Sequence, residues 1–297
     1  MILVTGASGK VGNAVTRKLI LSNRPFRVML RDPRKGKLIP SGNVQSIIGD
    51  FEKPATLSLA FQGVKKLFLV SDPSAEQVKL HANVFNAAKK AGVTHIVRVS
   101  AFGASANSPV TFFKLHAQSE QELQGSGIPF THIRPSYFYQ NFENFAPTIA
   151  KERAFYAPVK AAPVSMVDIR DVASVICSVL TEDGHENKSY DVTGPQALTF
   201  QDAANHFTSF YNGPTVKYND LPPEKWAAAM TEVGMTPWLT NSLSELYTHM
   251  AAGKFTGVTP VVQQVTKQPA RPFKGFAEEF IRVLKEAESL RLGRGSR

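Results

Sequence analysis

Short apolar runs alternate along the first half of the chain with longer segments whose apolar residues recur every three or four positions. The run ILVT at 2–5 is rich in β-branched residues and predicts a buried strand. In the segment 13–22, Val15 and Leu19 lie one helical turn apart among polar residues, which predicts a helix. The same alternation predicts further strands at 26–31, 44–49, 66–71, 95–102 and 130–136, and further helices at 54–64, 75–92 and 113–127. Strands and helices that alternate at short intervals are typical of a doubly wound parallel sheet in an α/β protein.

Composition excludes several classes of protein. The chain has 297 residues, 43% of them apolar and 20% charged, as in soluble globular proteins. No apolar run is long enough to span a membrane, and the start of the chain lacks the pattern of a signal peptide. The single cysteine, Cys177, excludes an internal disulfide and a cysteine-based zinc cluster, and we expect it to be a core residue. These features favour a cytoplasmic protein without a metal site.

The chain is basic, with a net charge of +10 and an isoelectric point near 9.6. A nucleic-acid-binding protein could have this balance, but the charges are scattered and form no long block of one sign. The densest excess is at residues 1–37, where nine Lys or Arg accompany one acid, Asp32. A small polyanionic ligand suits this region, so we expect no nucleic-acid partner.

Three glycines follow the first predicted strand, in the sequence VTGASGKVG. Gly6 permits a tight turn, Gly9 lets a pyrophosphate approach the backbone, and Gly12 lets the following helix pack closely. The amino end of that helix would present free N–H groups to the phosphates. This order of strand, turn and helix predicts a dinucleotide site, whereas the alternative is a glycine-rich turn without a ligand. The other expected contacts of the site are Thr5, Ala7, Ser8, Lys10 and Val11.

The end of the second predicted strand, VMLRDP, indicates which dinucleotide binds. NAD enzymes place an acid here to bind the ribose 2′-hydroxyl, but this chain has Arg31, followed by Arg34, Lys35 and Lys37. A guanidinium matches a 2′-phosphate with two parallel hydrogen bonds, so NADPH/NADP is favoured over NAD. Asp32 keeps the alternative open, because it could serve as the NAD acid if the strand ended one residue later.

The glycine spacing resembles that of extended and atypical short-chain dehydrogenase/reductases. Nearly the whole chain is similar to the NmrA-like group of these proteins, which contains NADPH quinone reductases, triphenylmethane reductases and redox-sensing regulators. The resemblance is carried by VTGASGKVG, VMLRDPRK, GDFEKPATLSLAFQGVKKLFLVS, AAKKAGVTHIVRVSAF and SGIPFTHIRPSYFYQNF. It implies that Asp50 and Phe51 lie by the adenine, and that Val70 and Ser71 also contact the cofactor.

Candidate catalytic residues follow from the same resemblance. The helix predicted at 113–127 has no Tyr-x-x-x-Lys motif, and His116 stands where the related quinone and triphenylmethane reductases have a histidine. A neutral histidine can hydrogen-bond a carbonyl, and a protonated one can deliver a proton. The alternative is a polar helix residue that faces solvent. Lys114 is a reserve candidate, and Ser100 matches the strand-end serine of the superfamily, although it could be a simple hydroxyl cap.

Candidate substrate contacts lie just past the strand that ends near Pro135. The resemblance implies that this loop borders the nicotinamide, although its aromatic residues could instead belong to the core. The expected contacts are Tyr137, Phe138, Tyr139, Asn141 and Phe142.

The sequence predicts two domains. Residues 1–150 form a Rossmann-type nucleotide-binding domain, and a strand at 186–195 completes its sheet. Residues 151–297 form mainly a smaller, mostly helical substrate lobe, in which the last predicted helix, at 274–290, has one apolar stripe. We expect this lobe to close over the nicotinamide.

Together these features predict an NADPH-dependent oxidoreductase that transfers hydride to a flat, apolar, electron-poor acceptor. Quinones, conjugated carbonyls and iminium dyes all have this chemistry. The alternative is a non-catalytic NADP(H)-sensing regulator that binds a partner protein, which would explain the missing Tyr-x-x-x-Lys motif. We expect a monomer or homodimer that does not bind membranes.

Overall fold

The computed structural model describes residues 1–39, 44–211, 213 and 215–294. The chain forms two compact units, each built from three segments. Unit 1 consists of Met1–Pro135, Ile169–Val192 and Val261–Gln268. Unit 2 consists of Ser136–Asp168, Thr193–Pro260 and Pro269–Arg297.

Unit 1 is built on a seven-stranded parallel sheet with the strand order β3-β2-β1-β4-β5-β6-β8. The strands are β1 (Ile2–Val4), β2 (Phe26–Leu30), β3 (Val44–Ile48), β4 (Lys66–Leu69), β5 (His95–Val99), β6 (Phe130–Pro135) and β8 (Lys188–Val192). The chain winds outward from β1 in one direction and then continues from β4 in the other. In an open parallel sheet, ligands bind beyond the carboxyl ends of the strands at such a reversal. The β1–β4 pair is therefore the place where a ligand crevice is expected.

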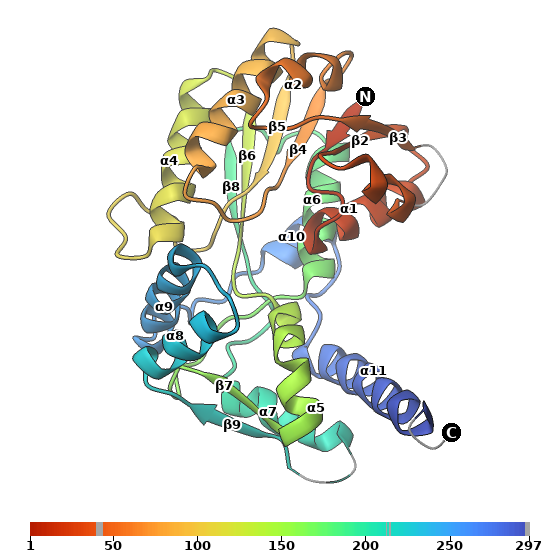
Figure 1. Cartoon of the computed structure of the whole chain (residues 1–297). Helices are drawn as coiled ribbons and strands as arrows, with labels where there is room; N and C mark the ends of the chain where they lie inside the picture. Colours follow the sequence, from red (N-terminus) through yellow and green to blue (C-terminus); the bar gives the residue numbers. More distant parts are fainter. Residues whose placement is uncertain (40–43, 212, 214, 295–297) are drawn as a thin grey trace. The chain divides into compact units, whose positions relative to one another are not determined.

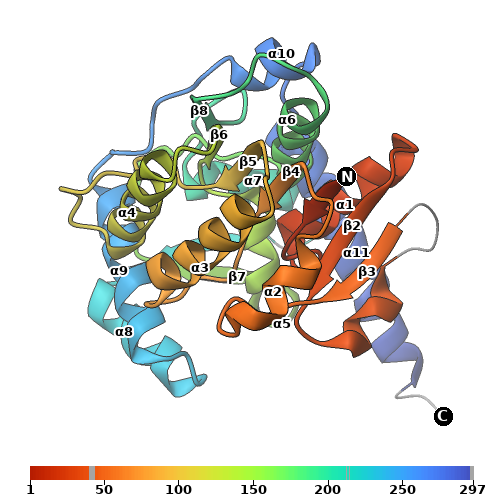
Figure 2. The same ribbon diagram turned by 90° about the horizontal axis from the view of Figure 1, so that it is seen from above.

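Helices cover both faces of this sheet (Figures 1 and 2). One face carries α1 (Lys10–Leu21) and α6 (Ile169–Thr181), which pack on each other, with α10 (Val261–Thr266) against α6. The other face carries α2 (Pro54–Ala60), α3 (Gln77–Lys90) and α4 (Thr111–Gly125). Because both faces are covered, consecutive residues of a central strand are buried, as Leu67, Phe68 and Leu69 are in β4.

Unit 2 combines helices with one small sheet. The strands β7 (Ala154–Ala157) and β9 (Lys217–Asp220) pair in parallel. The helices are η2 (Tyr139–Phe145), α5 (Ala146–Glu152), α7 (Phe200–Tyr211), α8 (Pro223–Glu232), α9 (Pro237–Ala251) and α11 (Phe273–Arg294). An aromatic cluster forms the core, in which the ring of Phe142 contacts those of Phe145, Phe155, Phe200, Phe207 and Phe273.

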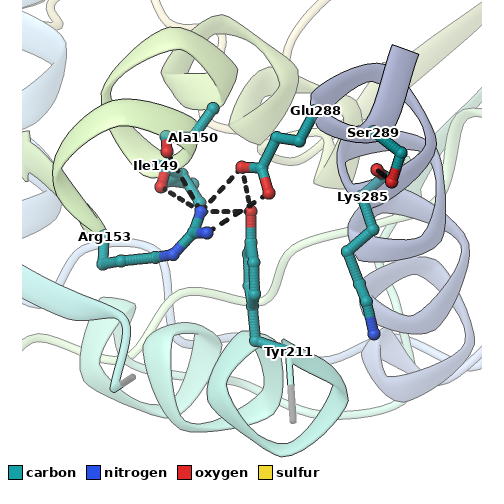
Figure 3. Close-up of polar contacts among 7 residues, drawn as sticks. All are labelled: Ile149, Ala150, Arg153, Tyr211, Lys285, Glu288 and Ser289. Atoms are coloured by element: carbon teal, nitrogen blue, oxygen red, sulfur yellow. Dashed lines mark hydrogen bonds and ion pairs between the residues drawn. The ribbon is translucent and has the colours of Figure 1, made fainter. Parts of the chain in front are cut away.

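A polar cluster ties three helices of unit 2 together (Figure 3). Arg153 ends α5 in the left-handed conformation (φ 54°) and donates to the carbonyl oxygens of Ile149 and Ala150. Its guanidinium also donates to the Tyr211 hydroxyl and pairs with Glu288, with an Nη1–Oε1 distance of 2.7 Å. The Tyr211 hydroxyl donates to the same carboxylate over 2.6 Å. Arg153 thereby connects the end of α5 to α7 and α11.

The predicted fold class, a doubly wound parallel sheet, is confirmed. In the structure, β8 pairs with β6 at one edge of this sheet. The helix predicted at 13–22 begins earlier, at Lys10, because the turn residues themselves wind into its first turn. The pairing of β7 with β9 was not predicted, since AFYA is too short to read and KYND is polar. Among the residues described, no helix is long and apolar enough to cross a membrane.

Candidate functional site

The glycine turn connects the carboxyl end of β1 to α1. Gly6 has a φ of +59°, and a Cβ there would lie 2.7 Å from Cγ1 of Val70, so only glycine fits. A Cβ on Gly12 would overlap the carbonyl oxygen of Gly6, which explains the close packing of α1 on the turn. A Cβ on Gly9 would meet only the Gly6 carbonyl oxygen, at 3.4 Å. The fold therefore requires glycine at two of these positions, whereas Gly9 leaves room on the outside of the turn.

The amino end of α1 is suited to phosphate binding. Gly9 is the N-cap in extended conformation, without a side-chain cap, and no acidic residue lies in the first turn. Helix N–H groups that lack side-chain partners, together with the positive end of the helix dipole, attract anions. Residues 6–12 could therefore hold the pyrophosphate of a dinucleotide.

Thr5 joins the two strands at which the sheet order reverses. Its hydroxyl donates to the carbonyl oxygen of Val70 over 2.9 Å and accepts the Val70 N–H over 2.9 Å. The side chain is almost fully buried. Thr5 and Val70 thus hold the ends of β1 and β4 together under the glycine turn, so their hydroxyl and amide are committed to the fold.

Arg31 and Asp32 follow β2 and differ in their surroundings. The Asp32 carboxylate caps the short helix η1 (Pro33–Leu38), where it accepts the backbone N–H of Arg34 over 2.9 Å. It also accepts Nε and Nη2 of the Arg34 guanidinium, over 3.0 and 2.9 Å. The hydrogen bonds from Arg34 lower the pKa of Asp32. Arg31 is exposed. The acid is therefore directed into its own loop, while Arg31 is available to an anionic ligand.

Asp50 and Phe51 follow β3. The Asp50 carboxylate accepts the N–H of Glu52 over 3.0 Å, which fixes a tight turn. The carbonyl oxygen of Phe51 accepts Nδ2 of Asn83 over 2.9 Å, so α3 holds this loop in place. The Phe51 ring lies edge-on to His81, with their centroids 6.4 Å apart.

A buried polar cluster lies between the sheet and helices α3 and α4, centred on Arg98 of β5. The Arg98 side chain is fully buried. Its Nε donates to Nδ1 of His81 in α3 over 3.2 Å, and its Nη2 donates to Nδ1 of His116 in α4 over 3.0 Å. Nε2 of His81 lies 3.0 Å from the Ser71 hydroxyl, just past β4. The cluster connects two predicted site residues, Ser71 and His116, through two residues that sequence analysis missed.

The protonation of His116 follows from this geometry. A guanidinium can only donate hydrogen bonds, so Nδ1 of His116 must accept and the neutral ring carries its proton on Nε2. The side-chain amide of Gln77 also lies 3.5 Å from Nδ1. Burial, followed by the charge of Arg98, lowers the pKa of His116 well below its ordinary value of 6.5. His116 is thus a neutral hydrogen-bond donor at neutral pH.

The other two catalytic candidates differ from His116. Ser100 follows β5 and is buried, and its hydroxyl helps to lower the pKa of the Glu120 carboxyl group in α4. Lys114 is exposed, on a different side of α4 from the half-buried His116. Of the three candidates, only His116 has a side chain that the cluster orients.

The predicted substrate loop lies in unit 2, and its residues divide into two groups. Tyr139 and Phe142 are fully buried in the aromatic core, where Tyr139 packs on Phe273 and Phe276. Their burial favours the alternative that sequence analysis left open, in which these two aromatic residues belong to the core. Phe138 and Asn141 are half-buried.

Tyr137 is the first aromatic residue of this loop and is buried. Burial, followed by the contact with Tyr247 of α9, raises the pKa of Tyr137 well above its usual value of 10. A hydrogen bond with Asn141 opposes this rise. Tyr247 packs edge-on against Trp226 of α8, with ring centroids 5.0 Å apart. Within unit 2, the loop is thus in contact with the helical pair α8–α9 through Tyr247, which sequence analysis did not single out.

Comparison with known proteins gives the family. The model of the NmrA-like family matches residues 1–276. The chain belongs to the NmrA-like family. The family predicted from the sequence motifs is thereby confirmed.

Individual relatives of this NmrA-like protein include several reductases. It is 37% identical over 278 residues to an NAD(P)H azoreductase of Xenophilus azovorans, covering 94% of this chain and 97% of the relative. Its structure resembles that of an NADPH-dependent quinone oxidoreductase of Escherichia coli in complex with NADPH, with a TM-score of 0.86 and 27% identity, covering 94% and 99% of the two chains. It also resembles the triphenylmethane reductase of a Citrobacter species in complex with NADP(H), with a TM-score of 0.84 and 25% identity, covering 94% and 100%.

The residues that sequence analysis missed in this NmrA-like protein are His81, Arg98, Asn83, Trp226 and Tyr247. One of them gave a signal, because Arg98 interrupts HIVRVS, an otherwise apolar strand that the pattern predicts to be buried. A charge in a buried strand needs polar partners, and sequence alone does not indicate which helices supply them.

Proposed function

We propose that this chain is an NADPH-dependent reductase that transfers hydride to a flat, apolar, electron-poor acceptor such as a quinone, a conjugated carbonyl or an iminium dye. The observation that carries the proposal is the uncapped amino end of α1, at the β1–β4 reversal of the sheet. The named activities of the relatives support an NAD(P)H-dependent reduction, and the azoreductase adds azo compounds to the acceptors worth testing.

The residues of unit 1 fit a phosphorylated dinucleotide. The space outside Gly9 and the N–H groups of α1 would hold the pyrophosphate. Arg31 would bind the 2′-phosphate, since Asp32 is engaged by Arg34. Asp50 and Phe51 would lie by the adenine. When bound, NADPH supplies the hydride.

His116 would bind and orient the acceptor rather than protonate it. Because Arg98 occupies Nδ1, the Nε2–H group is the one available to donate, to a carbonyl oxygen or an azo nitrogen of the acceptor. Its lowered pKa keeps the ring neutral near pH 7, so it is a poor source of a proton. Of the two roles that the sequence left open for His116, we propose hydrogen bonding.

The remaining assignments extend this proposal. Tyr137, Phe138 and Asn141 would contact a flat substrate through ring faces and an amide, as the resemblance implies. Ser100 and Lys114 remain reserve candidates. The division into a nucleotide-binding domain and a substrate lobe, the cytoplasmic location and the monomeric or homodimeric state stay predictions.

The experiment that tests the proposal has two parts. Calorimetric titration with NADPH and NADH measures cofactor affinity, and the loss of NADPH absorbance measures turnover with a naphthoquinone, an azo dye, a triphenylmethane dye and an enone. Tight NADPH binding with turnover of at least one acceptor class supports a reductase. Tight binding without turnover of any of them would favour the regulator, and absence of NADPH binding would contradict both.

A further inference from the structure

We propose that Arg98 is a positioning residue that holds both His81 and His116 in the form protonated on Nε2, so that one buried guanidinium orients the donors at the cofactor side and at the acceptor side of the site. This inference rests on the proposed function for the meaning of the two sides. The geometry that carries it lies wholly within unit 1.

The guanidinium contacts the two histidines through different nitrogens. Nε reaches Nδ1 of His81 at 3.2 Å, and Nη2 reaches Nδ1 of His116 at 3.0 Å. Since arginine has no acceptor, both Nδ1 atoms receive a hydrogen bond and both ring protons lie on Nε2. The planar, rigid fork of arginine makes the two contacts at once, whereas the ammonium of a lysine is a single point on a flexible chain.

On the His81 side, the effect passes to a serine. The Nε2–H of His81 donates to the Ser71 hydroxyl over 3.0 Å, which uses a lone pair of that oxygen. The hydroxyl proton of Ser71 is then left to donate at the carboxyl end of β4, where the cofactor is expected. Arg98 thus sets the direction of hydrogen bonding at Ser71 as well as at His116.

The surroundings of Arg98 keep its nitrogens available for this task. The carboxylate that acts on the charge of Arg98 is that of Glu120. This carboxylate is itself paired with Arg134, with an Nη2–Oε2 distance of 2.5 Å and an Nε–Oε1 distance of 2.9 Å. Arg98 forms no ion pair by contact among the residues described. Glu120 therefore compensates the charge of Arg98 through the field, while the guanidinium directs its Nε and Nη2 donors at the imidazoles.

The position of Arg98 in the sheet excludes a surface role. It pairs in register with His132 of β6, and both side chains are fully buried under α3 and α4. A buried guanidinium without a contact to a carboxylate is costly unless it is hydrogen-bonded, and the two histidines are the partners that the structure provides.

The test combines histidine spectroscopy of the NADP⁺-bound protein with steady-state kinetics of the same protein supplied with NADPH. Long-range proton–nitrogen correlation spectra of isotope-labelled histidine report which ring nitrogen carries the proton. We expect His81 and His116 of the wild type to be protonated on Nε2 only. In Arg98→Met, we expect both His81 and His116 to populate two tautomers, kcat to fall about tenfold or more, and the NADPH Kd to rise because Ser71 is no longer oriented.

Two further variants sharpen the result. Arg98→Lys keeps a positive charge but can restore only one of the two histidine contacts that Arg98→Met loses. Its spectrum should therefore match that of the wild type for at most one of the two histidine rings. Arg27→Met is a matched control, since its guanidinium lies in the same sheet but bonds the carbonyl oxygens of Ala60 and Gln62. It should leave both histidines and kcat unchanged.

Several outcomes would overturn the inference. A proton on Nδ1 of His116 in the wild-type protein would by itself contradict the inference. This measurement needs no variant, so the test holds even if Arg98→Met does not fold. A wild-type histidine spectrum in Arg98→Met would also overturn it. If no acceptor is reduced, the proposed function fails, while the spectra still decide whether Arg98 fixes the two tautomers.

Discussion

The carboxylate of Asp32 lies 2.9 Å from Nη2 of Arg34 and accepts the backbone N–H of the same residue. An acid in this position is directed away from the end of β2, where a ribose would lie. The contact therefore bears on which dinucleotide the chain prefers.

Arg31→Ala should weaken NADPH binding by about 2–3 kcal/mol and leave NADH binding nearly unchanged, because the lost guanidinium would bond only the 2′-phosphate. Calorimetric titration with both cofactors measures the difference. Arg24→Ala, which removes an exposed arginine ahead of β2, is the control. An equal loss for NADPH and NADH would contradict the 2′-phosphate role.

Gly9→Ala should affect NADPH binding, whereas Gly12→Ala should affect the stability of the fold. A methyl group on Gly9 has room within the protein, so stability should change by less than about 1 kcal/mol while NADPH affinity falls sharply. A methyl group on Gly12 would overlap the Gly6 carbonyl oxygen and should destabilise the fold by about 1–3 kcal/mol or more. Urea unfolding and calorimetry separate the two effects. Unchanged NADPH affinity in Gly9→Ala would remove the pyrophosphate from this turn.

The pH profile of kcat should lack an inflection near the ordinary histidine pKa. His116 has a pKa well below 6.5, so its protonation state does not change between about pH 6 and pH 8. His116→Ala should lower kcat about tenfold or more by removing the donor, and its profile over this range should have the same shape as that of the wild type. A wild-type profile that falls with a midpoint near 6.5, and loses this fall in His116→Ala, would instead assign proton delivery to His116.

Acid should destabilise the protein through His132. Burial lowers its pKa to about 4 in the folded state, against 6.5 when unfolded, so the unfolded chain binds the extra proton between these values. Stability is therefore fully present above pH 6.5 and falls as the pH drops towards 4, by roughly 3 kcal/mol from this group.

His132→Leu tests this linkage, since neither ring nitrogen of His132 has a hydrogen-bond partner among the described residues. The free energy of unfolding, measured in urea at pH 7 and pH 5, should depend less on pH in the variant than in the wild type. Identical pH dependence would mean that His132 is not the group that titrates.

The Arg153–Glu288 pair should contribute to the stability of unit 2. Arg153→Met removes its bonds to Glu288, Tyr211 and the end of α5 together, and should cost about 1–3 kcal/mol. Both side chains are about a quarter exposed, so solvent screens the ion pair and limits its contribution to stability. A double-mutant cycle with Glu288→Gln measures the coupling, and additive effects would contradict a direct pair.

How far the sequence predicts this protein depends on whether the evidence is local. The alternation of apolar runs gives the parallel sheet, and the glycine spacing gives the turn at Gly6, because both depend on neighbours in the chain. His116 was found by resemblance, but its tautomer depends on Arg98, which is distant in sequence. The burial of Tyr139 and Phe142 likewise depends on Phe273, and no local pattern separates such a core aromatic from a pocket aromatic.

The chain leaves unit 1 and returns to it twice, so unit 2 consists of two long insertions and a terminal segment. During synthesis β6 is complete at Pro135, but its open edge is covered only when β8, at Lys188–Val192, has been made. Until then the nascent sheet presents an unpaired parallel edge, which is prone to association. The same arrangement means that the segments between these returns can change length and sequence in evolution while every strand of the sheet keeps its neighbours.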